Sequence, residues 1–259
     1  MEPRIVRHGE VDSTSARAFA ALADGTGRHG DVHVAEAQSA GRGRRGRAWA
    51  SPRGEGLYLS VLWRPATLPH PAALTMGAGL AVLETVRALG VRAARLKWPN
   101  DVLVAGTDAA RAAKLAGILV ESRGLDPAHP HAVVGIGLNV RQLAFPPELE
   151  AERPVTSLAR LGLDCTPEEV LVVLLARLAP RLDEACERPA ATASAYGNAL
   201  GLASEVVRVV HGRGETTGRL VALGLDGIEL ETADGRVRLP LEHVQALEAA
   251  SLAPRPRVP

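Results

Sequence analysis

The segment GRGRRGR (residues 41–47), called the Gly–Arg loop below, holds the residues of this sequence that are best suited to chemistry. It supplies three glycines and four arginines, so a flexible backbone alternates with permanent positive charge. The N–H and guanidinium groups of such a loop can surround a phosphate or a carboxylate. A solvated basic loop and a nucleic-acid contact are the alternative interpretations, and the loop alone does not decide among the three.

Two lysines are the next candidates. Of the 30 Lys and Arg residues, only Lys97 and Lys114 are lysines. A lysine retained in an arginine-rich chain indicates a position that needs a compact point charge, although chance is the alternative explanation. Lys97 also begins the segment KWPND (residues 97–101), in which a proline kinks the chain and leaves Asn100 and Asp101 at a loop edge.

Polar groups that could bind a neutral head group stand before a predicted helix and after a predicted strand. The hydroxyls of Ser13, Thr14 and Ser15 precede a helical pattern, where capping is the simpler interpretation and lining a ligand pocket is the other. Gln38, at the start of the Gly–Arg loop, offers both a donor and an acceptor. With Trp49 for stacking, this set suits a nucleotide and a carboxylate-bearing small molecule bound side by side, although no Walker A or Rossmann fingerprint is present.

Hydrophobic periodicity predicts the elements that must position these groups. We expect strands over residues 5–7, 32–35, 57–63, 102–104, 115–121 and 133–140, and helices after Ser15 and over residues 71–89, 170–187 and 191–200. Short alternating segments at 205–210, 217–223, 227–232 and 236–241, separated by glycine-containing turns, indicate a small barrel of SH3-like type. The expected organisation is a domain over residues 1–201, a barrel over 202–252 and a disordered tail over 253–259.

Composition narrows the class of protein. The chain has 259 residues, of which 46% are hydrophobic and 23% charged, and a net charge of +1. These values are typical of a soluble globular protein, and the near-neutral charge argues against a general nucleic-acid binder. No apolar run is long enough to span a bilayer, so we expect no membrane association and a cytoplasmic location. Cys165 and Cys186 lack metal-ligand spacing and are expected to be free thiols.

Five segments resemble the biotin–protein ligases, also called biotin–acetyl-CoA-carboxylase ligases. They are DSTS (residues 12–15), QSAGRGRRGR (38–47), KWPND (97–101), KLAGILVE (114–121) and GIGLN (135–139), in the family's order. The resemblance implies an α+β fold: a mixed β-sheet catalytic domain of the class II synthetase-like biotin/lipoate ligase type, followed by a small SH3-like β-barrel. It also implies an enzyme that forms biotinyl-adenylate from biotin and ATP and then biotinylates a lysine of a biotin carboxyl carrier domain.

The resemblance also implies roles for individual residues. Biotin would be bound by Ser13, Thr14, Ser15, Gln38, Gly41, Arg42, Gly43, Arg44, Lys114 and Gly117. The nucleotide would be bound by Arg44, Arg45, Arg47, Trp49, Lys97, Asn100, Asp101, Lys114 and Asn139, with Asp101 near Mg²⁺ at the ATP phosphates. Lys114 and Arg44 would be the catalytic residues. For Lys114 a physical reason stands apart from the family, because a desolvated ammonium offsets the repulsion of two reacting anions.

Several features depart from the family pattern or leave alternatives open. Ser15 stands where the family often has asparagine, and residues 102–113 look longer than usual, with a tip that we expect to have no catalytic role. Only about a dozen residues precede Ser13, so we expect an enzyme without the DNA-binding domain of the repressor members. A homodimer is an open possibility. A lipoate or octanoate ligase and a nucleic-acid-binding module remain the rival functions, and Gln38 with the Gly–Arg loop favours biotin's polar head over an aliphatic chain.

Overall fold

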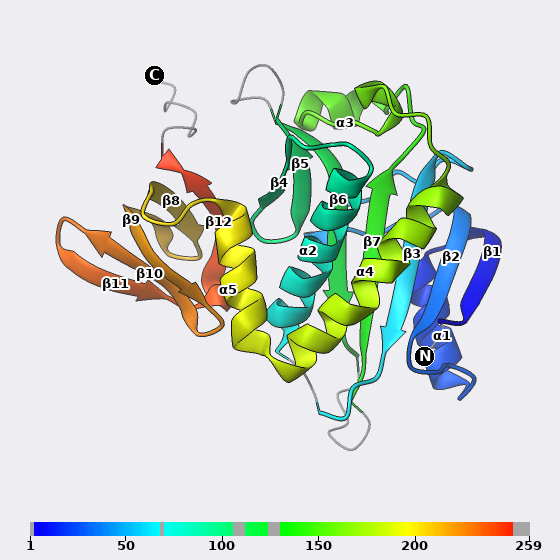
Figure 1. Ribbon diagram of the computed structural model, residues 1–259, viewed down its shortest axis with the longest axis horizontal. Coiled ribbons are helices and arrows are strands. Elements are labelled where there is room, and N and C mark those ends of the chain that lie inside the picture. Colours follow the sequence, from blue (N-terminus) through cyan, green and yellow to red (C-terminus); the bar gives the residue numbers. More distant parts are fainter. Residues whose placement is uncertain (1–2, 68–69, 106–111, 124–129, 251–259) are drawn as a thin grey trace.

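A mixed seven-stranded sheet and a five-stranded antiparallel sheet form the protein. The computed structural model describes residues 3–67, 70–105, 112–123 and 130–250. The expected disorder of residues 253–259 and the tip of the 102–113 segment lie outside these residues. In Figure 1 the larger sheet lies beside the smaller one, which the last part of the chain forms. The expected α+β fold class, a mixed sheet followed by a small β unit, is confirmed.

The larger sheet has the strand order β1-β2-β3-β7-β6-β5-β4. β1 and β2 are parallel, and the other neighbouring strands are antiparallel. The strands are β1 (Ile5–Val11), β2 (Asp31–Gln38), β3 (Gly56–Trp63), β4 (Ala94–Lys97), β5 (Asp101–Val104), β6 (Ala113–Glu121) and β7 (Ala132–Asn139).

Helices cover both faces of this sheet, which explains why β3 and β7 are almost continuously apolar. Leu62 and Val133 pack with Phe19 of α1 (Thr14–Ala23) on one face. Their chain neighbours Val61 and Val134 belong to the main core on the other face. That core includes buried side chains of α2 (Pro71–Ala88), α4 (Pro167–Glu187) and α5 (Pro189–Leu200). Figure 1 shows α2 and α4 in front of the sheet, α5 beside them next to the smaller sheet, and α1 behind.

The smaller sheet has the order β11-β10-β9-β8-β12, with every neighbouring pair antiparallel. Its strands are β8 (Val206–His211), β9 (Gly214–Gly224), β10 (Gly227–Thr232), β11 (Gly235–Leu239) and β12 (Val244–Ala249). The sequence predicted the first four. The core cluster contains Val207 and Leu230 of this sheet together with Tyr196 of α5, so the division at residue 201 stays a prediction.

The sequence analysis missed the strands β4 and β12, the short helix α3 (Pro147–Glu152) and the 3₁₀ helices Arg44–Gly46, Ala159–Leu161 and Leu241–His243. β4 has four residues, two of which are the charged Arg95 and Lys97, so its alternation of apolar and polar residues was too short to be recognised as a strand. β4 and β5 pair as a hairpin, and their connection contains a cis peptide bond before Pro99. Among the described residues, no helix combines the length and apolar character needed to cross a membrane.

Two stacked histidines on β1 and β2 predict an acid-sensitive stability. Nε2 of His8 lies 3.1 Å from Nδ1 of His33, and His33 is 3% exposed. Burial, reinforced by the neighbouring charge of His8, lowers the pKa of His33 from 6.5 to about 4. Between about pH 4 and pH 6.5 the unfolded chain therefore binds more protons than the folded protein. We expect the free energy of unfolding to fall by about 2 kcal/mol between neutral pH and about pH 5, and this contribution to be fully retained above the ordinary histidine pKa.

Urea denaturation at neutral pH and at about pH 5 measures this effect. His33→Phe removes the titrating group and should make the loss of stability clearly smaller. His243→Gln, at an exposed position, should leave the loss unchanged. An equal acid-induced loss in His33→Phe and the unaltered protein would assign the sensitivity to other groups.

Candidate active site

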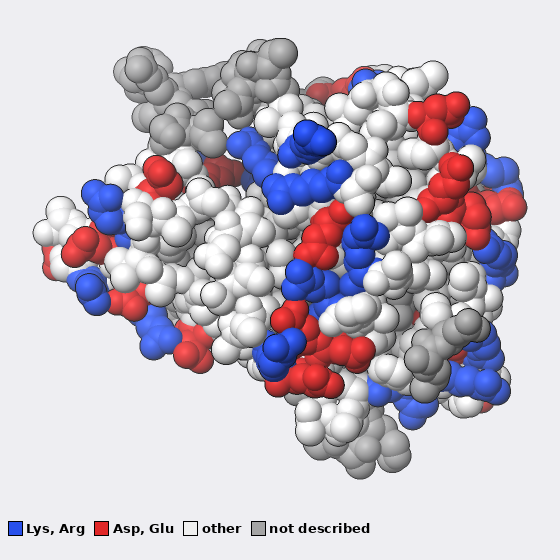
Figure 2. All heavy atoms as spheres, in the orientation of Figure 1, with Lys and Arg blue, Asp and Glu red and all other residues white. Residues whose placement is uncertain are grey.

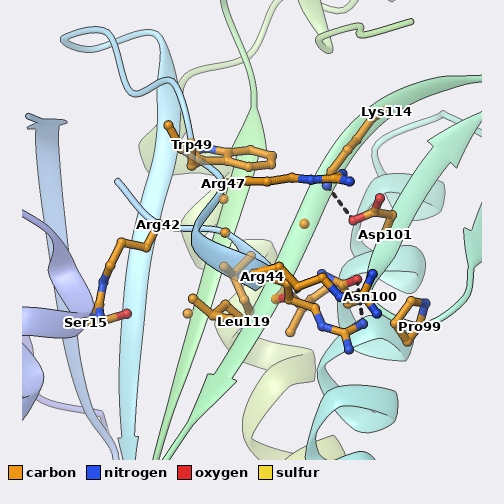
Figure 3. A pocket seen from close by; sticks show the side chains of 18 of the residues that line it. Ser15, Arg42, Arg44, Arg47, Trp49, Pro99, Asn100, Asp101, Lys114 and Leu119 are labelled. Atoms are coloured by element: carbon orange, nitrogen blue, oxygen red, sulfur yellow. Dashed lines mark hydrogen bonds and ion pairs between the residues drawn. The ribbon is translucent and has the colours of Figure 1, made fainter. Parts of the chain in front are cut away.

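A pocket of about 210 Å³ opens where the start of α1, the Gly–Arg loop and the β4–β5 turn meet the middle of β6 and β7. The predicted residues that line it are Ser13, Thr14, Ser15, Gln38, Arg42, Gly43, Arg44, Arg45, Arg47, Trp49, Lys97, Asn100, Asp101, Lys114 and Gly117. Figure 3 shows Arg44 beside Asn100 and Arg47 pointing toward Lys114 and Asp101, whereas Arg42 points the other way, toward Ser15. Segments more than 100 residues apart in the chain thus meet at one cavity.

Two predicted residues lie outside this lining. Gly41 is buried beneath the loop, where a Cβ atom would lie 2.5 Å from the carbonyl oxygen of Trp49. Asn139 lines a smaller adjoining cavity. It donates from Nδ2 to the carbonyl of Thr156 (2.9 Å) and accepts from Gln142 (3.4 Å), so in this conformation its amide braces the segment that follows β7.

The floor of the pocket is a buried network of hydroxyl and amide groups. The hydroxyls of Thr14 and Ser60 lie 2.8 Å apart, and those of Ser15 and Ser60 lie 3.1 Å apart. The Thr14 N–H donates to Oε1 of Gln38 (2.9 Å). Ser13 accepts from the N–H of Ala16, so the predicted capping is confirmed for this residue. Ser60 was missed, and its signal was a serine within the apolar strand LYLSVLW.

The Gly–Arg loop is folded back on itself by its own backbone. The Gly43 N–H donates to the carbonyl of Arg47 (2.7 Å), and the Trp49 N–H donates to that of Gly41 (2.9 Å). Between them, Arg45 has a φ of 59° and Gly46 a φ of 74°. Glycine adopts this left-handed region at little cost, which explains one of the interleaved glycines. The result is a tight hairpin that lies over the pocket.

The four arginines of this hairpin contact four different parts of the protein. Arg42 pairs with Glu121 of β6 (3.1 Å), and Arg44 donates to Oδ1 of Asn100 (3.5 Å). The other two contacts are Arg45 to Gln245 of β12 (3.4 Å) and Arg47 to Glu152 of α3 (3.7 Å). The loop therefore spans the pocket from the larger sheet to the smaller one.

Trp49 lies against the sheet because two glycines make room for its indole. Gly117 and Gly137 are register partners on β6 and β7. A Cβ atom on Gly137 would lie 2.3 Å from Cε2 of the indole, and one on Gly117 would lie 3.0 Å from Cζ3. Nζ of Lys114 is 5.3 Å from the ring centroid. The close approach that Gly137 permits is therefore that of Trp49.

Lys114 places a nearly buried ammonium beside one carboxylate. The residue is 8% exposed, and its Nζ lies 2.5 Å from Oδ1 of Asp101. Burial lowers the pKa of Lys114, the charge and hydrogen bond of Asp101 oppose this change, and the charges of Arg153 and Arg47 add to it. The other lysine, Lys97, pairs with Glu248 of β12 (3.0 Å).

The adjoining cavity has an apolar wall that the sequence analysis did not find. It shares Trp49, Lys114 and Arg153 with the main pocket, and Phe145, Leu149 and Val155 add an apolar lining. Residues 141–158 are mostly irregular, so no periodicity marked them. Trp49 and Lys114 thus stand between the polar pocket and a small cavity of about 20 Å³ with an apolar wall.

The main pocket is strongly cationic. Its described lining contains Arg42, Arg44, Arg45, Arg47, Lys97, Lys114 and Arg153, against Asp101 as the single carboxylate. Four of these cations pair with a carboxylate: Arg42, Arg47, Lys97 and Lys114. Among the described lining residues only Asp101 carries a carboxylate, so the lining keeps a positive charge that favours an anionic ligand. The protein is thus of the α+β class, with a pocket suited to an anionic small molecule.

The chain belongs to the biotin/lipoate A/B protein ligase family, whose model matches residues 10–139. The biotin–[acetyl-CoA-carboxylase] ligase of Mycobacterium tuberculosis is 45% identical over 159 residues, which are 60% of this chain and 54% of that protein. The enzyme of the same name from Paracoccus denitrificans is 39% identical over 168 residues, covering 63% and 67%. The bifunctional ligase/repressor BirA of Salmonella typhimurium is 46% identical over 114 residues, covering 44% and 34%.

A solved structure shares the whole architecture. The biotin protein ligase from Aquifex aeolicus, in complex with biotin and ATP, has a TM-score of 0.76 and 30% identity, and the alignment covers 95% of this chain and 99% of that one. The expected biotin/lipoate ligase fold is therefore confirmed. The matched regions span only about a third to a half of the Salmonella and Mycobacterium proteins.

Proposed function

We propose that this protein activates biotin with ATP to form biotinyl-adenylate and then transfers biotin to a lysine of a biotin carboxyl carrier domain. The observation that carries the proposal is the position of Lys114 between a polar pocket and an apolar cavity. The Aquifex ligase, with which this chain shares its fold, was solved with biotin and ATP. The relatives named biotin–[acetyl-CoA-carboxylase] ligases support the same reaction.

The hydroxyl floor suits biotin's ureido head. Thr14, Ser15, Ser60 and Gln38 offer donors and acceptors in a buried setting, where each hydrogen bond also discriminates against ligands that cannot make it. Arg42 of the Gly–Arg loop would close over the bound ligand. The biotin carboxylate would then point toward Lys114.

The nucleotide would lie on the other side of Lys114. Phe145 and Leu149 offer apolar contacts for adenine beside Trp49. A biotin carboxylate oxygen attacks the α-phosphorus of ATP, the bond from this phosphorus to the bridging oxygen breaks, and pyrophosphate leaves. The ammonium of Lys114 offsets the repulsion between the two anions, and Arg44 stabilises charge on the phosphates.

The second step transfers biotin to the carrier domain. The neutral amine of the acceptor lysine attacks the carbonyl carbon of the mixed anhydride, the bond from this carbon to the phosphate oxygen breaks, and AMP leaves with its charge near Lys114. The acceptor amine loses a proton to solvent. Because the anhydride reacts with water, a Gly–Arg loop closed over the pocket protects it.

Mg²⁺ fits this site only as a partner of the nucleotide. Among the described residues no group of three or more His, Cys, Asp or Glu side chains could hold a metal ion. Mg²⁺ commonly retains waters and binds through one or two carboxylates and the substrate phosphates, and Asp101 provides one such carboxylate. The ion would supply further positive charge at the phosphates.

The pocket favours biotin over lipoate or nucleic acid. Lipoate's chain and dithiolane ring offer no hydrogen-bonding groups to the buried hydroxyls of the floor, whereas biotin's ureido group can use the donors and acceptors that these hydroxyls do not spend on one another. On the face shown in Figure 2, basic and acidic side chains are interspersed, without the extended basic surface that nucleic-acid binders use. The carrier-domain partner, a homodimer and a cytoplasmic location stay predictions.

Calorimetry with biotin, ATP, lipoate and an oligonucleotide tests this function. Biotin should bind alone, ATP should bind more tightly once biotin is present, and pyrophosphate should be released. Lipoate and the oligonucleotide should show no heat of specific binding. Lipoate binding without biotin binding would support the rival ligase, and specific oligonucleotide binding would support a nucleic-acid function.

Ligand binding is expected to protect the Gly–Arg loop from trypsin. The four arginines of the loop are exposed or half-buried, and the loop is held by few contacts. Cleavage within residues 42–47 should fall sharply when biotin and ATP are added, because the closed loop loses the extended conformation that proteases bind. Cleavage at Arg213, in an exposed turn of the smaller sheet, serves as the internal control. Equal loop cleavage with and without ligands would contradict a ligand-ordered loop.

The reaction is expected to lose activity at alkaline pH because of Lys114. Burial lowers the pKa of this ammonium below its ordinary 10.5. Only the protonated form offsets the charge of the reacting anions, so kcat/KM for adenylation should fall with rising pH before an ordinary lysine would titrate. Rates measured between neutral pH and about pH 10 show this alkaline decrease of kcat/KM. Lys114→Arg should retain low activity that does not decrease at alkaline pH. An unchanged alkaline decrease in this variant would mean that a group other than Lys114 causes it.

A further inference from the structure

The segment after β7 is fixed directly to the backbone of Lys114. The Lys114 N–H donates to the carbonyl of Pro154 (2.9 Å), and the Thr156 N–H donates to the carbonyl of Lys114 (2.9 Å). Lys114 and Val155 form an isolated parallel bridge. Residues 154–156 therefore act as a short extra strand against the start of β6, and whatever precedes them is held close to the ammonium.

Arg153 is the residue that this arrangement brings to the site. It lines both the main pocket and the adjoining cavity. Its Nε is buried and, within the described part of the chain, has no hydrogen-bond partner. Its positive charge lies near enough to Lys114 to add to the effect of burial on that group's pKa. A buried N–H without an acceptor is unfavourable, so a ligand acceptor is expected at this point.

The nearby carboxylates pair with other cations, so the guanidinium of Arg153 is available to bind a ligand. Glu152, the preceding residue, pairs with Arg47 of the Gly–Arg loop (3.7 Å), not with Arg153. Asp101 is paired with Lys114 (2.5 Å), so it offsets much of the positive charge that Lys114 would otherwise offer to a phosphate. A second cation at the same place restores the charge that an incoming anion needs.

We propose that Arg153 binds the α-phosphate of the nucleotide together with Lys114. The inference rests on the proposed function and adds a phosphate contact from residues 141–158 to those of the Gly–Arg loop. Its guanidinium can donate two parallel hydrogen bonds to phosphate oxygens, which a lysine cannot do. Arg153 then holds the phosphate while pyrophosphate leaves in the first step, and while AMP leaves in the second.

The test compares AMP with adenosine, which differ only in this phosphate. Binding of both is measured by calorimetry at saturating biotin for the unaltered protein, Arg153→Gln and Arg153→Lys. The matched control is Arg141→Gln, at an exposed position in the same segment that lines neither cavity. Arg153→Gln should lower the ratio of AMP to adenosine affinity at least about tenfold, with adenosine and biotin affinity unchanged. Arg153→Lys should show an intermediate ratio of AMP to adenosine affinity, and Arg141→Gln should show the same ratio as the unaltered protein.

Biotin-dependent exchange of pyrophosphate into ATP separates this inference from the proposed function. No exchange by the unaltered protein would refute the proposed function itself. Exchange by the unaltered protein, with an unchanged AMP to adenosine ratio in Arg153→Gln, would overturn the role of Arg153 alone. An equal loss of AMP and adenosine binding would also overturn it, because that pattern indicates a structural role. Should Arg153→Gln fail to fold, Arg153→Met, which keeps the apolar stem, takes its place.

Discussion

Replacing Lys114 by alanine is expected to slow biotinyl-adenylate formation by about a hundredfold to a thousandfold, equivalent to about 3 to 4 kcal/mol of transition-state stabilisation. The ammonium is 8% exposed and lines the pocket where the biotin carboxylate and the α-phosphate would meet. Without it the anions repel each other in a setting with little water, and Asp101 at 2.5 Å loses its counter-charge and adds to the repulsion. The fold should remain intact, because the strand contacts of Lys114 come from its backbone.

Biotin-dependent ATP–pyrophosphate exchange measures this effect, and circular dichroism with thermal melting checks the fold. Arg213→Ala, in an exposed turn distant from the pocket lining, is the control and should exchange at the normal rate. A Lys114→Ala variant that is folded and releases pyrophosphate at a near-normal rate would refute the role of this residue.

The second large effect is expected from a single methyl group at Gly137. In Gly137→Ala the new Cβ would lie 2.3 Å from the indole of Trp49, closer than any real contact allows. The indole must leave the surface of the sheet, and the Gly–Arg loop must move with it because the Trp49 N–H is bonded to Gly41. Overpacking of this kind costs about 1 to 3 kcal/mol, so we expect adenylation to fall about tenfold to a hundredfold.

Gly9→Ala is the matched control for this change. Gly9 also lies within a strand, but a Cβ there meets no atom within 4 Å. It should leave both the exchange rate and the tryptophan fluorescence unchanged, whereas Gly137→Ala should alter both. Normal exchange by Gly137→Ala would mean that the position of the indole on the sheet has no importance for the reaction.

The sequence predicted those parts of the fold and site that local patterns encode. The buried strands β3 and β7 appeared as apolar runs, and the hydroxyls at the start of α1 appeared as a cap and a pocket edge. The role of the glycines beneath Trp49 was not predictable, because it depends on the register of β6 against β7. Arg153 was missed because its segment has no periodicity, and its relation to Lys114 exists only through backbone pairing across the fold.

The contacts of the Gly–Arg loop were equally hidden, since its partners are far away in the chain. Arg42 reaches a carboxylate 79 residues later, and Arg45 reaches an amide 200 residues later. Composition revealed the cations but not what holds them. Only the assembled sheets bring Glu121 and Gln245 to opposite ends of one loop.

These four arginine contacts also set the kinetics of ligand exchange. Two of them are ion pairs: Arg47–Glu152 is exposed on both sides, and Arg42–Glu121 is partly exposed. Exposed ion pairs contribute about 0 to 1 kcal/mol apiece. The hairpin is therefore closed by several weak tethers, so its opening equilibrium lies near balance. Because salt weakens exposed ion pairs, higher ionic strength should loosen the Arg42–Glu121 and Arg47–Glu152 contacts, so that the pocket opens more often and retains the adenylate for a shorter time.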